Sequence, residues 1–112
     1  MGRGEIYCAN LDPVIGSEIS KTRPVLIISN DINNAYSQTV TILPITTATE
    51  KIYPFEVFIN KKDSKLSKDS KVKANQIRTI DKQRLLDKIS ELSEHKVSEV
   101  EEAILINPGI IL

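Results

Sequence analysis

The sequence predicts a β-rich α+β domain, most simply a small, partly closed β-barrel with a helix packed alongside. Two observations favour this fold class: five or six short runs of strand-forming residues separated by turns, and a helical apolar stripe near the C-terminus. The chain has 112 residues, of which 40% are apolar and 27% charged. That size and composition fit a single domain, residues 1–112, with a packed core.

The first predicted strands flank a loop. Residues 5–10 carry strand-forming side chains and end at the turn signature of residues 11–13, where Pro follows Asp. Residues 14–22 hold a glycine, two serines and mixed charges without periodicity, so they are predicted to form a surface loop. The uninterrupted run 24–28 is rich in β-branched residues and predicts a strand buried on both faces.

A short helical turn and a third strand follow. Asn30 or Asp31 is expected to cap a helical turn through Ala35, because Asn and Asp accept hydrogen bonds from the first free N–H groups of a helix. Residues 39–42 alternate polar and apolar side chains and predict a strand. Pro44 in the continuation of this strand predicts an edge or a bulge.

The second half contains two further strands and a basic segment. Residues 53–59 alternate and predict a strand, whereas the lysine-rich residues 61–71 are predicted to be an exposed loop or ragged hairpin. Residues 72–78 are predicted to be one strand. Asp81 can cap a short helix over residues 82–86.

The C-terminal segment predicts the longer helix. Ser93 is a suitable cap, and apolar residues at 97, 100 and 104 form one stripe at spacings of three and four. The helix is predicted to run from about Glu94 to Ile106, and the Asn-Pro-Gly sequence at residues 107–109 is a usual stop signal.

The balanced net charge of the chain hides a strong segregation. Residues 46–90 carry 11 basic and 6 acidic side chains, net +5, whereas residues 91–112 carry 1 basic and 5 acidic, net −4. Because local potential steers a charged ligand, this pattern favours a face that binds a polyanion. The alternative is a solvated, lysine-rich loop without a ligand.

Composition excludes several kinds of site. The single cysteine, Cys8, rules out an internal disulfide and multi-cysteine zinc sites, and we expect it to be buried in its strand. The single histidine, His95, is expected to face solvent and excludes sites that need two imidazoles. Catalysis would therefore depend on Arg, Lys, hydroxyl or carboxyl groups, with no cofactor or metal expected. No signal peptide or membrane span is apparent, so a cytoplasmic protein is expected.

Three places carry residues suited to phosphate chemistry. Arg23 precedes Pro24 at the start of a strand, so its guanidinium is held on a rigid element and can donate two hydrogen bonds to phosphate oxygens. Thr46 ends the third strand and offers a hydroxyl. Gln76 and Arg78 lie in a turn before Asp81; a pairing of Arg78 with Asp81 is the structural alternative there.

In order and spacing, seven short motifs resemble the MazF/PemK family of toxins of toxin–antitoxin systems. They are Arg3-Gly4-Glu5-Ile6-Tyr7, Asn10-Leu11-Asp12-Pro13, Gly16-Ser17-Glu18, Thr22-Arg23-Pro24-Val25, Ile28-Ser29-Asn30-Asp31, Pro44-Ile45-Thr46 and Gln76-Ile77-Arg78-Thr79-Ile80-Asp81-Lys82. The resemblance covers almost the whole chain. It implies an SH3-like, partly open barrel with a C-terminal helix, a homodimer, and cleavage of single-stranded RNA without metal. It also implies a cognate antitoxin whose acidic tail lies along the dimer groove.

The resemblance assigns residues to roles. It implies that Arg23 and Thr46 are catalytic, and that the remaining matched positions line or support the RNA groove, namely Ser17, Glu18, Asn30, Gln76 and Arg78. One branch of the family places an acid–base Asp where this chain has Asn75, so that scheme does not carry over. Two alternatives share the fold: a toxin that binds DNA gyrase and a catalytically inactive protein-binding relative.

Overall fold

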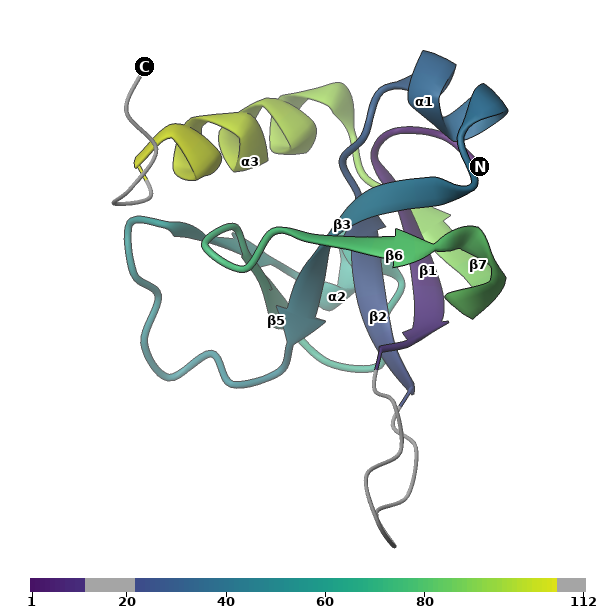
Figure 1. Ribbon diagram of the computed structural model, residues 1–112. Helices are drawn as coiled ribbons and strands as arrows, with labels where there is room; N and C mark the ends of the chain where they lie inside the picture. Colours follow the sequence, from purple (N-terminus) through teal and green to yellow (C-terminus); the bar gives the residue numbers. More distant parts are fainter. Residues whose placement is uncertain (12–21, 107–112) are drawn as a thin grey trace, which may run out of the picture.

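A computed structural model describes residues 1–11 and 22–106. The chain forms an antiparallel, open sheet that curves around a core (Figure 1). The strand order is β4-β5-β3-β2-β1-β7, and β6 pairs with β3 beside this path. The described strands are β1 (Glu5–Asn10), β2 (Thr22–Ile27), β3 (Thr39–Thr46), β4 (Glu56–Ile59), β5 (Ser70–Lys73), β6 (Arg78–Asp81) and β7 (Leu85–Glu91). The prediction of a partly open barrel with a C-terminal helix is therefore confirmed.

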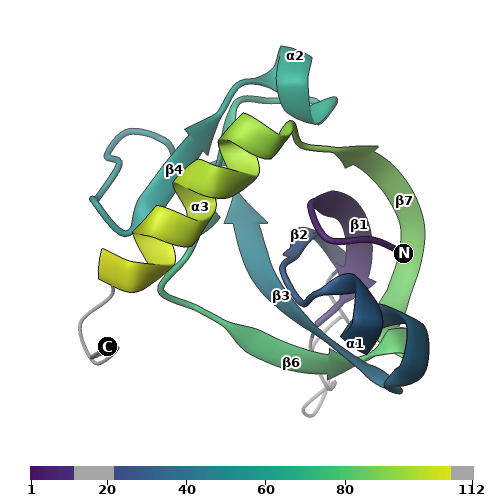
Figure 2. The same cartoon turned by 90° about the horizontal axis from the view of Figure 1, so that it is seen from above.

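The helices lie at the margins of the sheet. They are α1 (Asp31–Tyr36), α2 (Lys61–Ser64), the 3₁₀ turn η1 (Lys82–Arg84) and α3 (Glu94–Ile106). Viewed from above, α3 runs alongside β4 (Figure 2). Val100 and Ala103 of α3 are buried in the core. No helix within the described ranges is long and apolar enough to span a membrane.

Side chains divide between two apolar clusters because successive residues of a strand point to opposite faces. Leu26 on β2 pairs with Leu43 on β3, and both belong to the larger cluster, against which α3 packs. Their neighbours Ile27 and Ile42 pair on the opposite face and belong to the smaller cluster. Both faces of the central strands are thus buried, as the β-branched run 24–28 predicts.

On one side, the central strand β3 pairs with two different strands. Residues 39–42 pair with β6, whereas Ile45 and Thr46 pair with β5. Pro44 lies between these two pairings, at the point where a proline disturbs a ladder least. Pro44 pairs with β2 on one side, but neither β5 nor β6 pairs with it on the other, so this part of β3 has a locally unpaired side, as the edge prediction for Pro44 requires. The divergence of β5 and β6 opens a space beside the end of β3.

The three predicted caps are confirmed. Asn30 accepts a hydrogen bond from the N–H of Asn33 at the start of α1. Asp81 accepts one from Gln83 at η1, and Ser93 accepts one from Lys96 at α3. The described bounds of α3 are those expected from the sequence. Capping is a local interaction, so it can be predicted from neighbouring residues alone.

Several predicted elements were wrong. Residues 72–78 are not one strand, because a turn over residues 74–77 separates β5 from β6. Residues 61–71 are not an exposed loop, because they contain α2 and the start of β5, where Lys71 is buried. The short helix predicted over residues 82–86 ends at Arg84, because residues 85–91 form a full strand. The described part of the chain consequently has more strands and helices than the sequence suggested.

Candidate active site

A pocket of about 600 Å³ lies where β5 and β6 diverge from β3. Its walls come from β2, β3, β5, the start of β6 and the turn that joins β5 to β6, with Leu11 after β1 and Ala48 after β3. The side chains in these walls that can bind or act on a polar ligand are Arg23, Thr46, Lys71, Lys73, Gln76 and Arg78. Four of the residues predicted for the site, Arg23, Thr46, Gln76 and Arg78, therefore share one pocket.

Arg23 and Thr46 occupy equivalent places beyond the end of one ladder. The last pair of the β2–β3 ladder is Val25 with Pro44, and Arg23 and Thr46 stand two residues further along their strands. Since two residues complete one strand repeat, both continue the face that carries Val25. On that face the apolar cluster gives way to polar side chains.

The two side chains differ in how they are held. The Arg23 guanidinium is exposed and makes no hydrogen bond or ion pair within the described residues, although the backbone of Arg23 pairs with Ala9 on β1. Thr46 is half-buried, and its Oγ1 accepts a hydrogen bond from the N–H of Ala48 at 3.3 Å. The hydroxyl proton of Thr46 remains available to donate.

Arg78 ties the pocket to the end of β1. Its guanidinium donates to the carbonyl of Leu11, which also lines the pocket. The Arg78–Asp81 pairing considered from the sequence is not formed, because Asp81 caps η1 instead. The turn before β6 is fixed by a hydrogen bond from the N–H of Gln76 to the carbonyl of Lys73, 3.0 Å.

The remaining predicted residues lie elsewhere or outside the described ranges. Asn30 does not line the pocket; it caps α1, which follows the opposite end of β2 from Arg23. Ser17 and Glu18 fall in residues 12–21, which the structure does not describe. His95 is exposed as expected, whereas Cys8 is only half-buried and not fully so.

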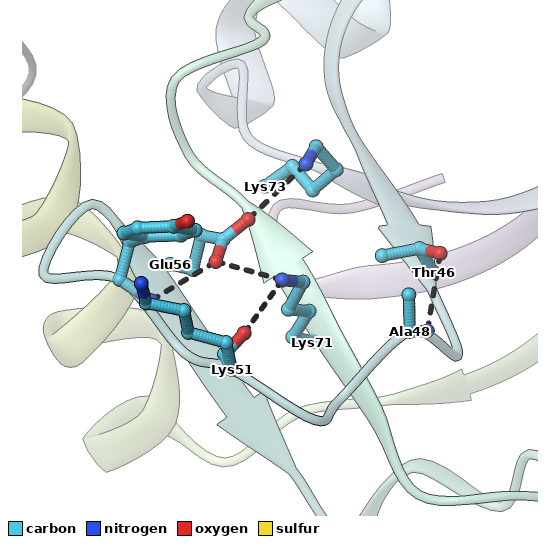
Figure 3. A network of polar contacts seen from close by, with 7 residues as sticks. Thr46, Ala48, Lys51, Glu56, Lys71 and Lys73 are labelled. Carbon is cyan, nitrogen blue, oxygen red and sulfur yellow. Dashed lines mark hydrogen bonds and ion pairs between the residues drawn. The ribbon is translucent and has the colours of Figure 1, made fainter.

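A buried ionic network adjoins the pocket and was missed by the sequence reasoning (Figure 3). Glu56 on β4 binds the ammonium groups of two lysines on β5: its Oε1 lies 2.8 Å from Lys71 Nζ, and its Oε2 lies 3.1 Å from Lys73 Nζ. Glu56 and Lys71 are each only 6% exposed. The lysine-rich segment therefore contributes to the inside of the site as well as to the surface.

Hydrogen bonds keep the Glu56 carboxylate charged. Burial of this group raises its pKa, but donation from Lys71, from the Tyr53 N–H and from Lys73 outweighs that effect and leaves the pKa below its usual value of 4.5. Lys71 Nζ also donates to the carbonyl of Lys51 at 2.8 Å. The network thereby fastens the segment after Thr46 to β4 and β5.

The alternation of lysine and apolar residues from Lys71 to Ala74 was the sequence signal that could have indicated this network. Val72 and Ala74 point into the larger core cluster, so Lys71 and Lys73 must share the other face of β5 with Thr46 on β3. No group of three or more His, Cys, Asp or Glu side chains that could hold a metal ion occurs among residues 1–11 and 22–106.

Comparison with known proteins identifies the family. The family described as PemK-like, MazF-like toxin of type II toxin-antitoxin system matches residues 2–107. Endoribonuclease MazF of Staphylococcus epidermidis is 49% identical over 109 residues, which cover 96% of this chain and 91% of that protein.

Solved structures agree with this match. A mycobacterial endoribonuclease in complex with its cognate antitoxin has a TM-score of 0.80 at 25% identity, covering 100% of this chain and 98% of that chain. The Mycobacterium tuberculosis toxin MazF-mt6 has a TM-score of 0.77 at 28% identity, covering 91% and 93%. The chain therefore belongs to the PemK-like, MazF-like toxin family of type II toxin–antitoxin systems, as its sequence motifs predict.

Proposed function

We propose that the pocket is the active site of a toxin that cleaves single-stranded RNA at a short sequence, with Arg23 and Thr46 acting on the scissile phosphate. The observation that carries this proposal is that both side chains line one pocket from different strands, just beyond the end of the ladder that joins those strands. Family membership and the name of the 49% identical relative support the activity.

The reaction uses the nucleophile that RNA already contains. The 2′-hydroxyl attacks the adjacent phosphorus, the bond to the 5′-oxygen breaks, and a 2′,3′-cyclic phosphate and a 5′-hydroxyl end remain. The enzyme must hold sugar and phosphate in line and stabilise the extra negative charge of the pentacoordinate state. Arg23 suits this task because its planar fork donates two hydrogen bonds to phosphoryl oxygens, and Thr46 adds a third donor.

The described walls of the pocket offer donors and no carboxylate or imidazole. Arginine remains protonated at neutral pH and is a poor base. The candidate for accepting the 2′-hydroxyl proton is Glu18, which the family resemblance places on the RNA groove. Gln76, with its amide, suits the reading of an unstacked base.

The proposal includes partners. As in the mycobacterial relative solved with its cognate antitoxin, we expect an antitoxin to bind this chain, with an acidic tail that competes with RNA for the basic pocket. We also expect a homodimer whose groove carries the RNA, and action in the cytoplasm on messenger RNA.

Incubation of the purified protein with a long RNA in EDTA tests the activity. We expect discrete cuts at one short sequence, with cyclic phosphate and 5′-hydroxyl ends on mapping. Cleavage that requires an added metal would contradict the metal-free mechanism. Intact RNA in the absence of antitoxin would instead favour a gyrase-binding or inactive relative.

A further inference from the structure

Two ammonium groups share a single carboxylate beside the pocket. Lys71 and Lys73 both bind Glu56, so the three side chains together carry one surplus positive charge. Lys71 and Glu56 have side chains that are 7% and 1% exposed. A charge surplus held in so little water attracts an anion more strongly than the same charge on an open surface.

The two lysines have different capacities to bind that anion. Lys71 Nζ donates to Glu56 and to the carbonyl of Lys51, and it also lies 5.9 Å from the centre of the Tyr53 ring. Its donors are occupied by the fold. Lys73 Nζ makes one hydrogen bond within the described residues, to Glu56 at 3.1 Å, and its side chain is 25% exposed. Two of its three N–H donors are therefore open to a ligand.

We propose that Lys73, whose ammonium group is held by Glu56, binds a second phosphate of the RNA next to the scissile one. This inference rests on the proposed function and names a further substrate contact. It assigns to Lys71 a structural part, because Lys71 neutralises Glu56 and holds the segment after Thr46.

Strand geometry places Lys73 at a suitable step from the scissile phosphate. Lys71 is the direct partner of Thr46 across the β3–β5 ladder. Lys73 lies two residues further on the same face of β5, which corresponds to roughly 7 Å along the strand. This step is comparable to the spacing of successive phosphates in an extended single strand. An RNA whose scissile phosphate meets Arg23 and Thr46 can thus present its neighbouring phosphate to Lys73.

Glu56 preorganises this contact. A flexible surface lysine loses rotamer freedom when it binds, whereas Lys73 is already held by Glu56, its direct partner across the β4–β5 ladder. The same carboxylate prevents the two ammonium groups from repelling each other apart. The arrangement supplies a preorganised phosphate contact at the wall of the pocket.

The test measures the binding of single-stranded RNA as salt is raised, for the wild type, Lys73→Met, Lys73→Arg and the control Lys68→Met. Lys68 is exposed and lies outside the pocket. The RNA carries a 2′-deoxy nucleotide at the mapped cut site, so it binds without reacting. We expect Lys73→Met to weaken binding about tenfold at low salt and to reduce the slope of log affinity against log salt by about 0.7, the value for one phosphate in a single strand. Lys73→Arg and Lys68→Met should keep the wild-type slope.

A scan with neutral methylphosphonate linkages then locates the contact. We expect one linkage adjacent to the cut site to weaken wild-type binding and to have no further effect in Lys73→Met. An unchanged salt slope in folded Lys73→Met overturns the inference. So does a scan in which the linkage whose effect disappears in Lys73→Met lies far from the cut site. If the wild type binds RNA but does not cut it, the proposed function fails and no cut site can be mapped; the salt slopes are then measured on unmodified single-stranded RNA and still decide whether Lys73 binds a phosphate. If Lys73→Met weakens only antitoxin binding, the surface serves the protein partner and the inference is wrong.

Discussion

Thr46 and Lys71 are direct partners across the β3–β5 ladder, so a half-buried hydroxyl and a buried ammonium group stand side by side on one face of the sheet. Lys71 donates to the carbonyl of Lys51, and Thr46 accepts from the N–H of Ala48. The segment that follows β3 is therefore held at Ala48 and at Lys51. The fold fixes the backbone on which the proposed catalytic hydroxyl stands.

We expect Arg23→Ala to reduce RNA cleavage by about ten-thousandfold or more, because it removes two donors and each is worth roughly 3 kcal/mol in the transition state. The free energy of unfolding should stay within about 0.5 kcal/mol of the wild type, since the guanidinium is exposed and has no described partner. Single-turnover cleavage and urea unfolding measure the two effects. Arg23→Lys, which keeps the charge and loses the fork, should show intermediate activity. Full activity in folded Arg23→Ala would refute the assignment.

Thr46→Val keeps the shape of the side chain and removes its hydroxyl. We expect the cleavage rate to fall by about a hundred- to a thousandfold, because one donor to the phosphoryl oxygens is lost. Thr46→Ser is the matched control and should keep most of the activity. Equal rates for the serine and valine variants would show that the hydroxyl does not act in the reaction.

Glu56→Ala is expected to destabilise the protein by about 3–5 kcal/mol, because it leaves Lys71 buried without its counter-charge. Urea unfolding measures this loss. Glu50→Ala is the control, since Glu50 is exposed and should change stability by about 0.5 kcal/mol or less. A Glu56→Ala protein as stable as the control would mean that the buried network contributes nothing to the fold.

Stability should fall in acid. For both Glu5 and Glu56, burial raises the pKa, but the hydrogen bonds from the lysines and backbone outweigh it and hold the folded pKa below 4.5. The unfolded chain therefore binds protons first as the pH decreases. Stability from these groups is fully present above about pH 4.5 and is lost as the pH falls through their folded pKa values. Urea midpoints measured from pH 6 to pH 3 should show this decrease, and Glu56→Gln should weaken it. An equal decrease in Glu56→Gln would assign the effect to other carboxyl groups.

Asn30→Ala distinguishes a capping role from RNA binding. The structure has Asn30 capping α1, so we expect a loss of about 1 kcal/mol in stability and an unchanged KM for RNA. Gln76→Ala should show the reverse, a raised KM with little change in stability, because Gln76 is exposed at the pocket. A raised KM in Asn30→Ala would show that RNA extends beyond the pocket to α1.

Features set by neighbouring residues were predictable from the sequence. The caps at Asn30, Asp81 and Ser93 and the bounds of α3 depend on short-range hydrogen bonds and periodicity. The grouping of Arg23 with Thr46 came from the resemblance to a known family. No local pattern joins them, since the two residues are brought to one pocket only by the pairing of β2 with β3.

The ionic network was not predictable in the same way. Lysine and glutamate are rarely buried, so a lysine-rich segment indicates a solvated loop unless each charge has a partner. The partner of Lys71 is Glu56, 15 residues earlier, and the pairing exists only once β4 and β5 are aligned. The turn that separates β5 from β6 was missed for a related reason: β3 pairs with β6 over residues 39–42 and with β5 at residues 45 and 46, and this division exists only in the folded sheet.

The alternation along β3 places a core residue and a residue of the proposed active site next to each other. Ile45 faces the larger core cluster, and the next residue, Thr46, faces the pocket. A slip of β3 by a single residue would exchange them, leaving a hole in the core and turning the proposed catalytic hydroxyl away from the pocket in one event. Copies with this slipped register should consequently lack the proposed active site.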